Sequence, residues 1–197
     1  MTIARRTIHP AEQYEYLIEA RERVFQHVRA LTQEQYTRKF PFGRGSVRAT
    51  LVHVADTEWW YTSILQGVPA PEERSPFRPY SRTGFGALEA AWGDLAGRTL
   101  QTLRGERDWG RPVEDRWTTK RWTRGVKTIA GGVATQLLFH EVHHRAQVMV
   151  MLRHLGAPLQ GLDYSLLKWE WIKEKRWSGS MPRRTPAADP RSQSSSS

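Results

Sequence analysis

The segment from about Lys127 to Leu155 has the clearest helical pattern in the chain and constrains the fold most. Its apolar residues recur in steps of three and four, which places them on one face of a helix. Gly156 and Pro158 follow at once, as is usual where a helix ends. Two histidines interrupt the core-facing stripe, which consists of Val133, Leu137, His140, His144, Val148, Met151 and Leu155. A helix with such a face needs partner elements to cover it.

Three further segments have helical character and are separated by glycine and proline. The first spans about residues 10 to 40 and the second about residues 46 to 67, with Ser46 as its predicted N-cap. The third starts near residue 83 and ends between residues 105 and 109. Gly93 and Gly97 lower the helix propensity of the third. Together with the segment ending at Leu155, these patterns predict an all-α fold with four main helices.

The regions outside these helices are less regular. Residues 109–125 are polar and rich in Trp and Arg, and fit either a short β-hairpin or an ordered loop between the third and fourth helices. Residues 166–177 predict one more short helix, with Leu166, Trp169 and Ile172 facing inward. Residues 178–197 contain Ser, Pro and Arg without apolar anchors, which predicts a disordered tail. The folded domain is therefore expected to span residues 1–177.

The absence of cysteine restricts the chemistry. It excludes disulfides, thiolate ligands and a cysteine nucleophile, so a metal ion would have to be bound by His, Asp or Glu. The N-terminal residues lack the apolar run of a signal peptide, and no stretch reaches the roughly 18 apolar residues of a membrane span. We therefore expect a cytoplasmic protein without a membrane partner.

The formal net charge is +10, which raises the hypothesis of a nucleic-acid binder. Part of this charge lies from Lys173 onward, in and close to the predicted tail. The remaining body is only moderately basic, as in many soluble proteins. We do not favour nucleic acid as a partner.

His140 and His144 are one helical turn apart, so both can direct a ring nitrogen at one cation. Without such a partner, an imidazole on the apolar face costs about 1–3 kcal/mol in lost hydrogen bonds. Residues 140–144 also match HExxH, the signature of zinc proteases. We do not favour a protease, because no downstream ligand signature follows. Glu141 is expected to face solvent or a helical neighbour.

His53 lies on the second predicted helix, with Asp56 one turn later. It is off the main aliphatic stripe, which consists of Val47, Leu51, Val54, Tyr61 and Leu65. By spacing alone, His53 is a partly exposed histidine without a ligand role.

Two stretches together resemble the DinB/YfiT-like superfamily: LVHVADTEWW around His53, and HEVHHRAQVMVMLRHLG from His140 onward. The usual pattern of that superfamily is L-x-H-x-x-D/E-x-E, followed by H-x-x-x-H-R-x-Q and a helix ending in L-R-x-L-G. The resemblance covers roughly residues 10 to 160, and the second stretch is its most specific part. Ala146 replaces a glycine that is often found there.

The resemblance implies a four-helix bundle with up-down-down-up connections. It also implies that His53, His140 and His144 bind a divalent metal ion, most often zinc or nickel, with water completing the coordination. His143 is the alternative ligand on the fourth helix. Arg145 and Gln147 match the R-x-Q of the pattern, with a structural or ligand-supporting role as plausible as a chemical one. Members of the superfamily often form homodimers.

Two functions follow from the resemblance. The first is a metal-dependent enzyme, such as an S-transferase that uses a small thiol, and the Arg-rich residues 109–124 would suit an acidic cosubstrate. The second is a damage- or stress-associated protein that acts through partners and holds a structural metal ion. A fourth protein ligand such as Asp56 or Glu58 would favour the structural metal, and an open position would favour the enzyme. The sequence indicates no particular general base.

Overall fold

The computed structural model describes residues 9–70, 75–118 and 123–170. The tail predicted for residues 178–197 therefore lies outside the described residues. The elements in chain order are α1 (Pro10–Arg29), α2 (Gln33–Thr37), α3 (Val47–Leu65), the 3-10 helix η2 (Arg78–Arg82), α4 (Phe85–Gly105), β1 (Pro112–Thr118), β2 (Thr123–Ile129), α5 (Ala130–His154) and α6 (Tyr164–Lys168). The predicted all-α fold with a short hairpin is confirmed.

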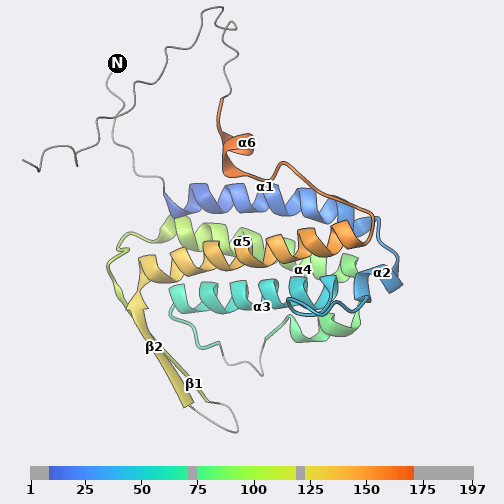
Figure 1. Cartoon of the computed structure of the whole chain (residues 1–197). Helices are drawn as coiled ribbons and strands as arrows, with labels where there is room; N and C mark the ends of the chain where they lie inside the picture. Colours follow the sequence, from blue (N-terminus) through green and yellow to red (C-terminus); the bar gives the residue numbers. More distant parts are fainter. Residues whose placement is uncertain (1–8, 71–74, 119–122, 171–197) are drawn as a thin grey trace, which may run out of the picture.

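Helices α1, α3, α4 and α5 form a four-helix bundle, with the β1–β2 hairpin projecting from one end (Figure 1). Ion pairs between its surface side chains fix the direction of α1 against α4. Arg29 near the end of α1 pairs with Glu89 near the start of α4, and Glu15 near the start of α1 pairs with Arg104 at the end of α4. The two helices are therefore antiparallel.

Helices α3 and α4 run in the same direction, because earlier residues of α3 contact earlier residues of α4 and later residues contact later ones. Glu58 accepts a hydrogen bond from Trp92, and Gln66, further along α3, donates to Thr102. The start of α4 therefore lies at the same end of the bundle as the start of α3 (Figure 1).

Helix α5 runs opposite to α3, because His53 lies against His144, and Tyr61, two turns later on α3, lies against the earlier His140. The result is the up-down-down-up order that the family resemblance implied.

The first predicted helix is divided in two. α1 ends at Arg29, and α2 begins at Gln33 after a capping box in which Thr32 bonds the backbone N–H of Gln35 and the Gln35 side chain bonds that of Thr32. A capping box satisfies N–H groups that lack partners at a helix start, so it favours a new helix over continuation of the first. The predicted Ser46 cap is present and accepts from Ala49 N at 3.1 Å.

The fourth main helix begins three residues later than predicted, because residues 127–129 belong to β2. The strands are antiparallel, and Val113 of β1 lies opposite Thr128. Val113 is buried, whereas Ile129 is exposed. For residues 109–125 the sequence allowed a β-hairpin or an ordered loop, and the structure shows the hairpin. None of the helices within the described ranges is long and apolar enough to cross a membrane.

The core lies between the four long helices and contains the stripes that the sequence predicted. On α5, Val133, Leu137, Val148 and Met151 are at most 5% exposed. The predicted short C-terminal helix is present as α6, but its predicted inward face is wrong: Leu166 and Trp169 are exposed, and Ile172 lies outside the described residues. Leu159 and Leu162, which precede α6, are buried instead.

Candidate metal centre

Three histidine side chains converge between α3 and α5. His53 comes from α3, and His140 and His144 come from successive turns of α5. The Nε2 atoms of His53 and His140 are 3.2 Å apart, and one ring nitrogen of each of the three residues lies within 4.8 Å of the others. Two nitrogens bound to one tetrahedral zinc ion at about 2.05 Å are about 3.3 Å apart. The donor set and its spacing therefore fit a divalent metal ion.

The packing of α3 against α5 explains how His53 joins the pair on α5. Leu51 and Val54 on either side of it in the chain point into the core and are buried. His53 is half-buried, and its ring lies 4.7 Å from that of His144 and 4.9 Å from that of His140, measured between centroids. A position that looks peripheral on the isolated helix is thus turned toward the neighbouring helix.

All three imidazoles are held in the neutral form that binds metal ions. Burial lowers the pKa of His53 to about 4, with further contributions from the charges of Arg44 and His144. Burial also lowers the pKa of His140 to about 3, and the neighbouring histidines and Arg44 lower it further. The pKa of His144 is lowered chiefly by burial. At neutral pH the three lone pairs are therefore available to a cation.

Gln147 fixes the orientation of His144. Its Oε1 atom lies 2.9 Å from Nδ1 of His144, so Nδ1 carries the proton and Nε2 is left to face the other histidines. The amide nitrogen of Gln147 lies 3.0 Å from Nε2 of His143. On the other side, a Cβ added at Gly43 would lie 2.9 Å from Oε1 of Gln147. The side chain that supports His144 is therefore confined between α5 and the loop before α3.

The comparison with known families agrees with this arrangement. The family model described as DinB family matches residues 5–176, which is most of the chain. The chain belongs to the DinB family. None of the curated proteins matches this sequence.

Of the two candidate ligands next to each other on α5, the structure places only His144 with the other histidines. The His143 side chain is exposed and accepts from the Gln147 amide, outside the group of three converging rings. Arg145, which with Gln147 matches the family motif, is buried and donates to the Tyr16 hydroxyl at 2.6 Å. Tyr16 in turn donates to the carbonyl of Leu162 at 2.6 Å. Arg145 thus connects α5 to α1 and to the segment before α6.

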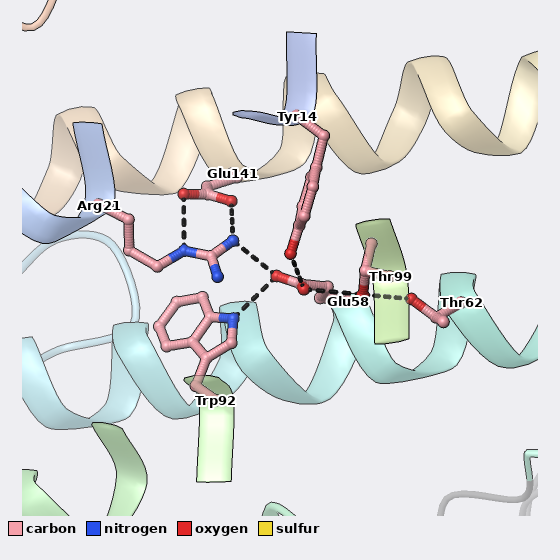
Figure 2. Close-up of polar contacts among 7 residues, drawn as sticks. All are labelled: Tyr14, Arg21, Glu58, Thr62, Trp92, Thr99 and Glu141. Atoms are coloured by element: carbon pink, nitrogen blue, oxygen red, sulfur yellow. Dashed lines mark hydrogen bonds and ion pairs between the residues drawn. The ribbon is translucent and has the colours of Figure 1, made fainter. Parts of the chain in front are cut away.

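Of the two expectations for Glu141, exposure to solvent is wrong, whereas contact with a helical neighbour is found, because its side chain meets Arg21 of α1. Its side chain is in the core at 4% exposure and accepts from Arg21 at 3.1 Å and 2.5 Å (Figure 2). Burial raises the pKa of Glu141, and the charge of Arg21 opposes that rise. Its carboxylate is therefore held by α1 and cannot act as the general base of a zinc protease.

Glu58 belongs to the same buried network. Figure 2 shows its carboxylate between Arg21 and Trp92, with Tyr14 and Thr99 also bonded to it. Arg21 donates to it at 2.8 Å and Trp92 at 2.8 Å. The sequence carries a signal for this network, since Arg21 follows Leu17 by four residues and precedes Val24 by three. It therefore occupies a core position of the α1 stripe.

Asp56 is bonded to the connection between α3 and α4. Its carboxylate accepts from the hydroxyl of Ser75, which is 7% exposed and lies in the connection between α3 and α4. The Ser75 hydroxyl also accepts from the backbone N–H of Phe77. Asp56 therefore helps to attach this connection to α3. Within the described residues, neither Asp56 nor Glu58 is part of the converging histidine group.

Proposed function

We propose that this DinB-family protein is a metal-dependent enzyme in which His53, His140 and His144 bind one divalent ion, zinc or nickel. The observation that supports the proposal best is the convergence of three neutral imidazoles without a fourth protein ligand among the described residues. Three histidines and an open position are typical of catalytic rather than structural zinc sites. When bound, such an ion lowers the pKa of a water or thiol ligand near neutral pH.

The protein's own residues have separate tasks in this proposal. His53 of α3 and His140 of α5 provide ring nitrogens from two neighbouring helices. Gln147 holds the proton of His144 on Nδ1. Hydrogen bonds of this kind, from the second ring nitrogen of a ligand histidine, orient the ring and raise its basicity.

The engagement of Asp56 and Glu58 elsewhere argues against a purely structural metal ion. Asp56 is bonded to Ser75, and Glu58 is held by Arg21 and Trp92. The bundle also has a continuous apolar core around α5 that does not depend on the histidines. We therefore expect the fold to survive removal of the ion.

For the reaction we propose S-transfer from a small thiol, as the family resemblance suggests. In such a reaction the thiol sulfur forms a bond to an electrophilic carbon, the leaving group departs with its electron pair, and the thiol proton passes to solvent. A homodimer and a cytoplasmic location stay predictions from the sequence.

The test is the metal content of protein purified without a histidine tag or chelator. His144→Ala is the variant and His143→Ala the matched control, because the two residues are adjacent on α5 and only the first joins the converging group. We expect about one zinc or nickel ion per chain in the native protein and the control, and none in His144→Ala.

Two outcomes would contradict the proposal. If the native chain stays metal-free after incubation with zinc, nickel and manganese, the histidines are core residues and not ligands. If chelation of a bound ion unfolds the helices, as followed by circular dichroism, the ion is structural and the enzyme proposal fails.

A further inference from the structure

Two histidines of the cluster each have a hydrogen-bonding side chain one helical turn further along their own helix. On α5, Gln147 follows His144 by three residues, and its Oε1 atom lies 2.9 Å from Nδ1 of that ring. On α3, Thr57 follows His53 by four residues, and its Oγ1 atom lies 3.5 Å from Nδ1 of His53. Residues three or four apart are neighbours on a helix surface, so the same local device occurs on both helices.

The direction of the Thr57 contact follows from the other bond that its hydroxyl makes. Oγ1 of Thr57 lies 2.8 Å from the backbone carbonyl oxygen of His53, which can only accept a proton. A hydroxyl has one proton and two lone pairs, so its proton goes to this carbonyl and a lone pair is left to face the ring. The contact with Nδ1 is therefore an N–H···O bond in which His53 donates, and its Nε2 atom carries a lone pair.

The contact between His53 and His140 then assigns the proton of the third ring. Their Nε2 atoms are 3.2 Å apart, which places a proton between them, because two lone pairs at this distance would repel each other. Since Nε2 of His53 is the acceptor, Nε2 of His140 is the donor. In the metal-free protein His53 and His144 thus already have an unprotonated Nε2. The proton of His140 has to move, by way of solvent, from Nε2 to Nδ1 before its Nε2 can bind an ion.

We propose that Thr57 is a positioning residue for the metal centre, which holds the proton of His53 on Nδ1 and so directs Nε2 at the ion. The proposal rests on the proposed function, since it concerns a ligand of the same ion. It predicts one tautomer for His53 and His144 and the other for His140 in the metal-free protein. Removing a hydrogen bond to the second ring nitrogen of a ligand histidine lowers metal affinity by about 10- to 100-fold.

The experiment measures the tautomer of His53 in metal-free protein, by nitrogen-15 NMR of the imidazole rings, and the affinity for zinc, by competition with a chelating dye. The signals of His53 are identified by their absence in His53→Asn. Thr57→Val removes the hydroxyl and keeps the branched shape, whereas Thr57→Ser keeps the hydroxyl. Thr135→Val is the matched control, because the exposed Thr135 of α5 also bonds the carbonyl four residues earlier, at 2.8 Å.

We expect the Nδ1–H tautomer of His53 in the native protein and in Thr57→Ser. In Thr57→Val the Nε2–H tautomer should gain population, and the affinity for zinc should fall by about tenfold, the low end of the usual range, because the bond to Thr57 is long. Thr135→Val should keep the native tautomer and the native affinity. This pattern would assign the effect to the contact with His53 and not to the helix bond that both threonines make.

Several results would overturn the role of Thr57 and leave the metal site standing. One is an Nε2–H tautomer of His53 in the native protein, and another is an unchanged tautomer or an unchanged affinity in Thr57→Val. A Thr57→Ser variant that behaves like Thr57→Val, or an equal loss in Thr135→Val, would also do so. If the native chain binds no ion, the proposed function fails, and the tautomers of the metal-free protein still decide whether Thr57 holds the ring of His53.

Discussion

Replacing Arg21 with methionine should destabilise the protein more than any single change on its surface. Arg21 is 5% exposed and donates to Glu58 and to both oxygens of Glu141, which are themselves 3% and 4% exposed. Methionine fills a similar volume but leaves two buried carboxylates without the cation that bonds them. Breaking a buried pair by removing one partner costs about 3–5 kcal/mol.

Arg23→Met is the control for this change. Arg23 lies on the same helix, but its side chain is 45% exposed and its ion pair with Glu19 is 3.6 Å long. Exposed pairs of this kind contribute about 0.3–0.5 kcal/mol. In urea unfolding of metal-free protein, we expect Arg21→Met to lose several kcal/mol and Arg23→Met to remain close to the native value. In a protein of this size, the larger loss corresponds to a fall in Tm of roughly 6–20 °C.

The pH dependence of the loss gives a second test. Without Arg21, the pKa of the buried Glu141 should rise further above its unfolded value of about 4.3. A carboxyl whose folded pKa is raised stabilises the fold below the unfolded pKa and loses that contribution as the pH rises through the folded pKa. The deficit of Arg21→Met should therefore be larger at pH 8 than at pH 5. A deficit below about 1 kcal/mol, or one that grows on acidification, would refute this account of the network.

Two further predictions concern the histidine site. Gly43→Ala should weaken metal binding, because its Cβ would lie 2.9 Å from Oε1 of Gln147. Gly45→Ala is the control, because the atom nearest to its Cβ is 3.8 Å away. Both variants should lose about 1–2 kcal/mol of stability because both positions have positive φ, but Gly45→Ala should keep its metal affinity. Equal metal affinities in the two variants, by competition with a chelating dye, would contradict the role of Gln147. Because the pKa of His53 is about 4 and that of His140 about 3, both below the unfolded value of about 6.5, the unfolded chain binds more protons in this range. The free energy of unfolding of the metal-free protein should therefore fall as the pH drops from about 6.5 toward 4, and a His53→Asn/His140→Asn variant should lose most of that dependence.

Local patterns in the sequence predicted the main helices and the pair of histidines on α5. The positions of His140 and His144 follow from the helical repeat alone, because residues four apart lie on the same face. The same repeat predicted the buried stripe of α5, and local capping rules predicted Ser46 at the start of α3. Each of these features depends on residues within a few positions of one another.

Features that join distant segments were decided by the tertiary structure. By spacing alone His53 is a peripheral residue, and it becomes a candidate ligand because α3 lies antiparallel beside α5. Arg21, Glu58 and Glu141 belong to three separate helices, and no local pattern in the sequence links them. Only the packing of α1, α3 and α5 brings their charges within hydrogen-bonding distance. A buried charge is tolerated when a partner of opposite charge meets it, and helical periodicity identifies which residues turn inward but not which of them meet.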